Sequence, residues 1–345
     1  MNEDQRNPDL SRRDFVRTAA IGVGGIGAAA LGGASVPPAA AQTGDAPLPT
    51  GNRPRIGGLH DKLVITLSPS GRASKDLPTQ GDMRDPKQHA DAAVEGFNAG
   101  AAIVHVRGQN LPSDPYPQGG PRPSSRPDLK NWDALTNLIK SRCNIVVNFG
   151  SAGMNPANRK NLLTLKPEAG SVLVSHHYLG LNVPEENVRQ ALIDHMEAGV
   201  LPEVEIFHTG ELANLTRMVD AGLIKPPFCV TIFFNWNPYH GVQPSLTQLQ
   251  ARLELLPPNT HWTMCAKGVG HLEMSALAIS LGGHVRTGLE MDVQLASGRM
   301  ARTQGECVER MVQLARALGR DVATPAEARV QLGLPRRPER PSVSS

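Results

Sequence analysis

The chain has 345 residues, of which 40% are hydrophobic and 19% charged, the composition of an ordinary globular protein. Its net charge of +3 is small and its basic residues are scattered, so we expect neither nucleic acid nor an anionic membrane surface as a partner. The length suits one large domain or two small ones.

The N-terminal segment has the order of an export signal. The stretch SRRDFVR, with Arg12 and Arg13, precedes the soft apolar run TAAIGVGGIGAAALGGASV, and small residues follow at Ala39 and Ala41. This order is typical of a cleaved signal, and the arginine pair resembles a twin-arginine signal. We predict a signal over 1–41 and a periplasmic or secreted protein that is not an integral membrane protein after cleavage. A membrane anchor is the alternative, for which the run is barely long enough.

From Lys62 onward, short β-branched runs alternate with helical patterns. Two of these patterns end on a glycine, at Gly100 and Gly199, where a helix C-cap favours one. Eight strands alternating with helices indicate a TIM (β/α)8 barrel, a fold of the α/β class. We therefore predict a flexible lead over 42–60, a single barrel domain over 61–334 and a disordered tail over 335–345. The expected strands are 63–69, 101–107, 144–151, 171–177, 203–210, 228–235, 261–268 and 284–290.

In a TIM barrel, the reactive side chains lie at the carboxyl ends of the strands. Residues two apart on a strand share a face, so His105 and Arg107 are expected to project together. Several histidines and a glutamate on one face indicate a metal site. The polar residues expected at this end include His105, Arg107, Ser151, His176, His208, Lys267, Arg286 and Glu290.

Several segments resemble the β-keto acid cleavage enzymes, the family typified by 3-keto-5-aminohexanoate cleavage enzyme. They are HADAAVEGFNAGAAIVHVR, PEVEIFHTGEL, LIKPPF, ALAISLGGHVRTGLE, RMVQLARALGRDVATPAEAR and the final LGL, in order and spacing. The resemblance implies a TIM barrel with one zinc ion and a homo-oligomer. It also implies a reaction in which a β-keto acid condenses with acetyl-CoA and the adduct is cleaved to acetoacetate and a new acyl-CoA. The family's zinc ligands are an H-x-H pair after the second strand and a glutamate after the eighth.

Position by position, the resemblance assigns the zinc glutamate to Glu290, the substrate-side arginine to Arg286 and the first histidine to His105. The second histidine falls on Arg107. A two-residue deletion would instead align His105 with the second histidine, and one zinc ligand is missing either way.

Other departures from the family also fall where its chemistry takes place. The family's presumed base, an aspartate, is replaced by Met291, a hydroxyl-bearing residue by His176 and another aspartate by His208. Ser151 is the nearest hydroxyl to a segment that carries serine and threonine in the family. Because acetyl-CoA is cytoplasmic and an export signal is predicted, we expect acetyl-CoA to be replaced as co-substrate.

Three functions stay open. The first is a metal-dependent enzyme that cleaves a carbon–carbon bond or hydrolyses a small keto or carboxylic acid, with metal-bound water in place of the thioester. The second is a non-catalytic binder of small carboxylates, and the third is the family reaction itself. For the first, the expected residues are His105, Glu290 and His176 as Zn²⁺ ligands, Arg286 or Arg107 for the substrate carboxylate, Lys267 and His208 as general bases, and Ser151 as a hydroxyl.

Overall fold

The computed structural model describes residues 61–69, 84–111, 126–178, 181–236, 242–291, 293–296 and 298–334. The predicted signal, lead and tail lie outside these residues. The chain divides into residues 1–47 and 48–345, and every described residue belongs to the second unit. Within the described ranges, no helix is both long and apolar enough to cross a membrane.

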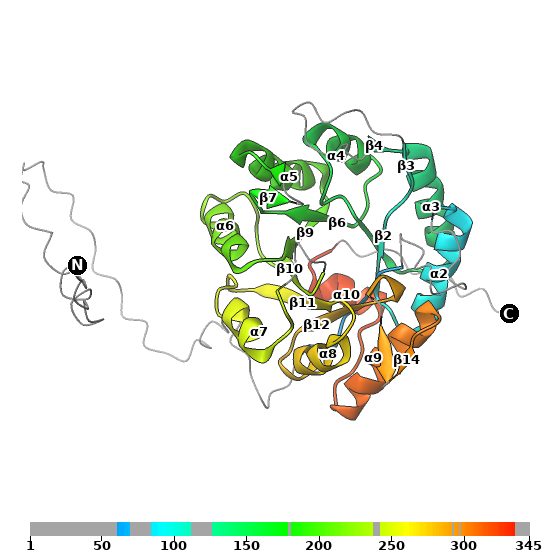
Figure 1. The fold of residues 1–345 in the computed structure, drawn as a ribbon. Helices are drawn as coiled ribbons and strands as arrows, with labels where there is room; N and C mark the ends of the chain where they lie inside the picture. Colours follow the sequence, from blue (N-terminus) through cyan, green and yellow to red (C-terminus); the bar gives the residue numbers. More distant parts are fainter. Residues whose placement is uncertain are drawn as a thin grey trace, which may run out of the picture. The chain divides into compact units, whose positions relative to one another are not determined.

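Eight parallel strands close into a barrel in the order β1-β12-β11-β10-β9-β6-β5-β2, with helices around it (Figure 1). The predicted TIM barrel is therefore confirmed. The barrel strands are β1 (Ile65–Leu67), β2 (Ile103–Val106), β5 (Val146–Phe149), β6 (Ala169–Leu173), β9 (Leu201–Ile206), β10 (Phe228–Phe234), β11 (Thr260–Ala266) and β12 (His284–Thr287). The α-helices are α2 (Pro86–Ala99), α3 (Leu129–Arg142), α4 (Pro156–Leu163), α5 (Glu185–Ala198), α6 (Thr209–Asp220), α7 (Leu246–Leu253), α8 (His271–Ser280), α9 (Gln304–Ala317) and α10 (Pro325–Gln331).

Local sequence signals explain where the helices begin and end. The side chain of Asp85 accepts a hydrogen bond from the N–H of Lys87 at the start of α2, whose first residue is a proline. The same helix ends at Gly100 in the left-handed conformation, with φ 114°. Gly199 ends α5 in the same way, with φ 67°. Both predicted glycine caps are confirmed, because glycine adopts positive φ without a steric penalty.

The barrel strands have different bounds from the predicted runs, and two of the differences move a residue that was predicted as a metal ligand. The run 171–177 was expected as one strand, but β6 spans Ala169–Leu173, so His176 lies beyond the barrel wall. The run 284–290 ends early, because Gly288 has φ 134° and the chain then forms the short 3₁₀ turn η1 (Leu289–Met291). Glu290 therefore lies on a turn above the barrel rather than on a strand.

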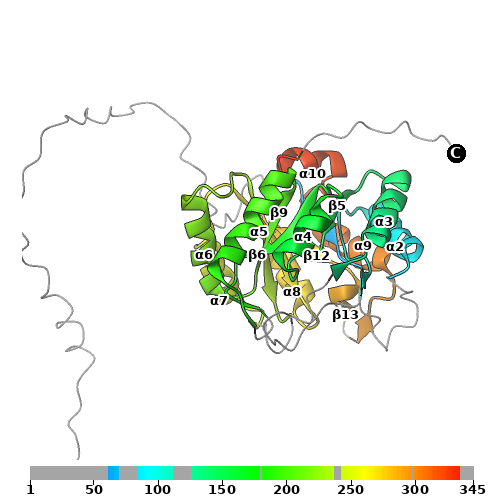
Figure 2. The same cartoon turned by 90° about the horizontal axis from the view of Figure 1, so that it is seen from above.

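The two ends of the barrel differ. At the amino end, α10 lies across the strand starts (Figure 2), and Ala328 and Leu332 pack there with Val64, Ala102 and Val146. At the carboxyl end, three short hairpins follow barrel strands. They are β3 (Asn110–Leu111) with β4 (Arg126–Pro127), β7 (His177–Tyr178) with β8 (Leu181–Asn182), and β13 (Gln294–Ala296) with β14 (Arg299–Met300).

Candidate active site

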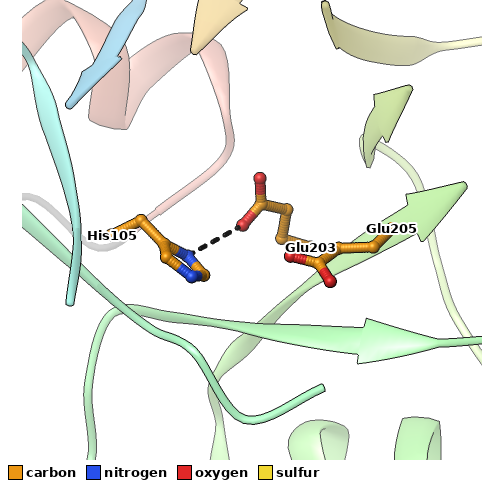
Figure 3. A group of neighbouring side chains, drawn as sticks. All are labelled: His105, Glu203 and Glu205. Atoms are coloured by element: carbon orange, nitrogen blue, oxygen red, sulfur yellow. Dashed lines mark ion pairs between the residues drawn. The ribbon is translucent and has the colours of Figure 1, made fainter. Parts of the chain in front are cut away.

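One histidine and two glutamates meet inside the barrel. His105 is on β2, and Glu203 and Glu205 are on β9, a strand that does not neighbour β2. Glu203 and Glu205 are two residues apart, so both point to the interior. One candidate ligand atom from each of the three residues lies within 4.8 Å of the others. Figure 3 shows the imidazole directed at the carboxylate of Glu203, with 3.8 Å between Nδ1 and Oε2.

The imidazole of His105 is buried without a hydrogen bond. Its exposed fraction is 1%, and neither ring nitrogen has a hydrogen-bond partner among the described residues. Burial, together with the positive charge of Arg286, lowers the pKa of His105 to about 4. The ring is therefore neutral at neutral pH and presents a nitrogen lone pair to the interior.

Glu203 is held as a carboxylate by neighbouring side chains. Its oxygens accept hydrogen bonds from the amide of Asn148 and the hydroxyl of Thr231. Burial opposes ionisation, but the contact with His105 and the charge of Arg286 outweigh it and lower the pKa of Glu203 to about 2.

Glu205 has less support for its negative charge. Burial raises its pKa to about 7, although Nη1 of Arg286 donates to Oε1 at 3.3 Å. The buried cluster contains three carboxylates, with Glu290 as the third, and two guanidinium groups. If all three carboxylates ionise, one negative charge has no cationic partner among these five residues.

Glu290 binds a different group with each oxygen. Nη1 of Arg107 donates to Oε1 at 2.6 Å. Oε2 accepts a hydrogen bond from the hydroxyl of Ser68 and lies 3.5 Å from Nη2 of Arg286. Burial would raise the pKa of Glu290, but the charges of Arg107 and Arg286 lower it to about 2.

The two arginines differ in exposure. Arg286 is fully buried, donates to Glu205 and Ser68, and lies over the ring of Phe233. The side chain of Arg107 is 42% exposed. Its guanidinium carbon lies 6.0 Å from the ring centre of Trp236, and the amino nitrogen of Lys267 lies 5.9 Å from the centre of the same ring. Arg107 is therefore the arginine that an incoming anion can reach.

The side chains of His105 and Arg107 both pack against Gly150. A Cβ on this glycine would lie 2.9 Å from Nε2 of His105, 2.7 Å from Cγ of Arg107 and 3.1 Å from its Nε. The expectation that these two side chains project together is confirmed.

Comparison with known proteins decides the family. Residues 62–334 match the family model described as beta-keto acid cleavage enzyme. The chain belongs to this family. A 3-keto-5-aminohexanoate cleavage enzyme of Fusobacterium nucleatum is 29% identical over 286 residues, which are 80% of this chain and 99% of that protein. A 3-dehydrocarnitine:acetyl-CoA trimethylamine transferase of Rhizobium meliloti is 29% identical over 314 residues, 81% of this chain and 99% of that protein.

A solved structure described as the ternary complex of ObcA with C4-CoA adduct and oxalate shares the fold. Its TM-score is 0.57 at 18% identity, over 74% of this chain and 68% of that chain. This likeness supports the barrel architecture alone.

The zinc set that the resemblance implies for this member of the β-keto acid cleavage enzyme family does not fit the residues present. In the ungapped alignment Arg107 stands at the second histidine, and its guanidinium binds the carboxylate of Glu290 directly. The other oxygen of Glu290 is engaged by Ser68 and Arg286. A divalent ion at Glu290 would lie against two positive charges, so no step is assigned to such an ion.

Two of the predicted residues, His176 and His208, lie outside this cluster. Nε2 of His176 is 3.0 Å from the carboxylate of Glu185, and its Nδ1 is 3.2 Å from the carbonyl oxygen of Val183. His176 is thus not in the group formed by His105 with the two β9 glutamates. His208 is exposed at the start of α6.

Two further predicted residues have clear positions. Ser151 is buried, and its hydroxyl donates to the carbonyl of Ser171 at 2.7 Å and lies 3.5 Å from Nε2 of His195. It therefore faces α5, which packs outside the barrel wall. Lys267 does belong to the group at the barrel mouth, because its amino group donates to the main-chain oxygen of Glu290 at 2.9 Å.

Sequence reasoning missed Glu203, Glu205, Ser68 and Trp236. The signal for the two glutamates was present in EVEIFHTG, where two acidic residues share one face of a strand expected to be buried on both faces. Buried carboxylates require partners. No comparable pattern indicated Ser68 or Trp236, which lie beyond strand ends and join the site through the fold.

Proposed function

We propose that this chain breaks a carbon–carbon bond of a small β-keto acid at the carboxyl end of its barrel. The observation that carries the proposal is the placement of the reachable cation Arg107 beside the buried His105, around Gly150. Membership of the β-keto acid cleavage enzyme family supports the reaction class. The names of two relatives, a 3-keto-5-aminohexanoate cleavage enzyme and a 3-dehydrocarnitine:acetyl-CoA trimethylamine transferase, support it further.

Arg107 would bind the substrate carboxylate. Only Nη1 of its guanidinium has a hydrogen-bond partner among the described residues, so the other N–H groups can form the two-point contact that suits a carboxylate. The indole of Trp236 shields one side of this contact from water. With the carboxylate there, the carbonyl group of a short substrate lies toward His105 and Lys267. We retain Lys267 as the general base in preference to the exposed His208.

The acceptor in the reaction follows from the proposed location. We propose export by the twin-arginine route, which makes water the acceptor, so that a β-keto acid and water yield two carboxylic acids. With acetyl-CoA, the products would be acetoacetate and an acyl-CoA. Association into a homo-oligomer, expected from the resemblance, is part of the proposal.

The test is a cleavage assay of the purified full-length chain with short β-keto acids, with water alone or with added acetyl-CoA. Mass spectrometry of the products distinguishes two acids from a new thioester. We expect Arg107→Gln to raise KM at least about tenfold, since a charged hydrogen bond contributes about 1.5–3 kcal/mol. Arg142→Gln is the matched control, because this exposed arginine pairs with Asp91 on the outer helices.

Two results would contradict the proposal. Saturable binding of β-keto acids without any cleavage would instead identify a non-catalytic carboxylate binder. Cleavage with unchanged KM in the Arg107→Gln variant would remove this arginine from the substrate site.

A further inference from the structure

The structure assigns a divalent metal site to His105, Glu203 and Glu205, inside the barrel and apart from the zinc set that the resemblance implies at Glu290. The first observation is geometric, since three candidate ligand atoms lie within 4.8 Å of one another. The second is the buried imidazole of His105, which is directed at these carboxylates and has no hydrogen-bond partner among the described residues. A buried polar group without a partner is costly unless something binds it.

The donor set indicates the class of ion. One imidazole and two carboxylates supply three protein ligands and leave coordination positions open for water or substrate. An imidazole suits Zn²⁺ and other first-row ions, whereas Mg²⁺ is bound mainly by oxygen. We therefore expect Zn²⁺, the ion that the resemblance also implies, or Mn²⁺ to bind, and Mg²⁺ to bind far more weakly.

Neighbouring side chains already orient these ligands. Asn148 and Thr231 donate hydrogen bonds to Glu203, and Arg286 donates to Glu205. Such supporting contacts fix the direction of metal ligands and raise affinity. All three ligands are on barrel strands, which hold their side chains more rigidly than loops would.

The charges of the cluster also favour a cation. Glu203, Glu205 and Glu290 carry three negative charges if ionised, and Arg107 and Arg286 supply two positive charges. Arg286 donates to Glu205 and Arg107 donates to Glu290, and among the described residues neither guanidinium donates a hydrogen bond to His105 or Glu203. A divalent ion between His105 and the two β9 glutamates would compensate the excess negative charge at the place where the histidine offers a ligand.

This site and the proposed reaction are separable. None of its three ligands is Arg107 or Glu290, so metal binding does not require that β-keto acids be cleaved. The experiment therefore measures metal binding and thermal stability, with no assay of activity.

The experiment uses the full-length chain, stripped with chelator and titrated with Zn²⁺, Mn²⁺ or Mg²⁺ in separate calorimetric runs. Bound metal is counted by elemental analysis, and the melting temperature is recorded with and without metal. We expect one Zn²⁺ or Mn²⁺ per chain and a rise in melting temperature, because a ligand that binds only the folded state stabilises it.

Two variants remove ligands and two serve as controls. The first ligand variant, Glu205→Gln, keeps an oxygen that accepts the hydrogen bond from Arg286 and removes a buried charge, so it should fold. The second ligand variant is His105→Gln. Each should weaken Zn²⁺ at least about 100-fold. His176→Gln should change the affinity less than about threefold. Glu290→Gln removes one charge of the cluster but no ligand, so it should weaken Zn²⁺ less than either ligand variant does. Circular dichroism of the metal-free proteins checks their folding.

Three results would overturn the inference. The first is a native chain that binds neither Zn²⁺ nor Mn²⁺. The second is an equal metal content in the native chain and in both ligand variants. The third is loss of metal in Glu290→Gln while Glu205→Gln retains it. The last result would restore Glu290 as the ligand. In that case a proton, rather than a metal ion, would neutralise the carboxylate of Glu205.

Discussion

Nη1 of Arg107 and Oε1 of Glu290 are 2.6 Å apart and join the end of β2 to the turn after β12. The resemblance places two ligands of the same zinc ion at these positions, and here they bind each other. A guanidinium therefore supplies the positive charge that this carboxylate needs. In the ungapped alignment, the two positions that the resemblance assigns to ligands of one ion are here the two partners of an ion pair.

The first prediction reverses this replacement. Arg107→His recreates the H-x-H pattern with His105 and frees Oε1 of Glu290. We expect Zn²⁺ affinity to rise at least about tenfold, since an additional imidazole ligand becomes available. Calorimetry measures this gain, which should disappear when Glu290→Gln is added. A gain that survives the second substitution would show that the new histidine binds zinc without Glu290.

The second prediction concerns Gly150. In Gly150→Ala, the new methyl group would lie 2.7 Å from Cγ of Arg107 and 2.9 Å from Nε2 of His105, so both side chains must move. We expect a loss of about 1–3 kcal/mol in the free energy of unfolding, as for other overpacked sites, and a higher KM. Urea unfolding and steady-state kinetics measure the two effects. Gly210→Ala is the control, because a Cβ there meets nothing within 4 Å.

The third prediction concerns the buried cation. Arg286→Met leaves Glu205 and Glu290 with less positive charge around them, and removing one partner from a buried ionic group costs about 3–5 kcal/mol. Urea unfolding measures the loss. Adding Glu205→Gln to this variant should recover part of it, since the amide carries no charge. Additive losses in the double variant would mean that the two residues do not interact in the folded protein.

The fourth prediction is a loss of stability in acid. Burial lowers the pKa of His195 to about 4 and also lowers those of His271 and His284. Between about pH 4 and 6.5 the unfolded chain therefore binds more protons than the folded chain, so the free energy of unfolding falls as pH drops through this window. Each histidine contributes up to about 1.4 kcal/mol per pH unit. Glu205, whose pKa is raised, gives the opposite slope, but His105 adds to the slope of the three histidines, so it is one group against four.

Urea unfolding of the metal-free protein at several pH values between these limits checks the slope. His195→Gln should make it shallower, because the amide cannot take up a proton in this range. An unfolding free energy independent of pH would contradict the assigned pKa directions.

The sequence predicted the barrel from local signals that need no tertiary information. β-branched runs mark the strands, and glycine caps at Gly100 and Gly199 end two of the helices. The strand-end rule also placed His105, Arg107 and Lys267 at one end of the barrel, because parallel strands share their direction. Those expectations depend on neighbours in the chain and on one topological rule.

Only the tertiary structure decided which of these side chains meet. His105 on β2 faces Glu203 on β9, although these two strands are not neighbours in the barrel. Strand β12 ends before Gly288, and the turn that follows places Glu290 within hydrogen-bond distance of Arg107. Such pairings depend on barrel closure and on where each strand ends, and a shift of a few residues moves a side chain out of the site, as for His176. Local sequence thus determined the fold and the face, and long-range packing determined the ion pairs and the proposed metal ligands.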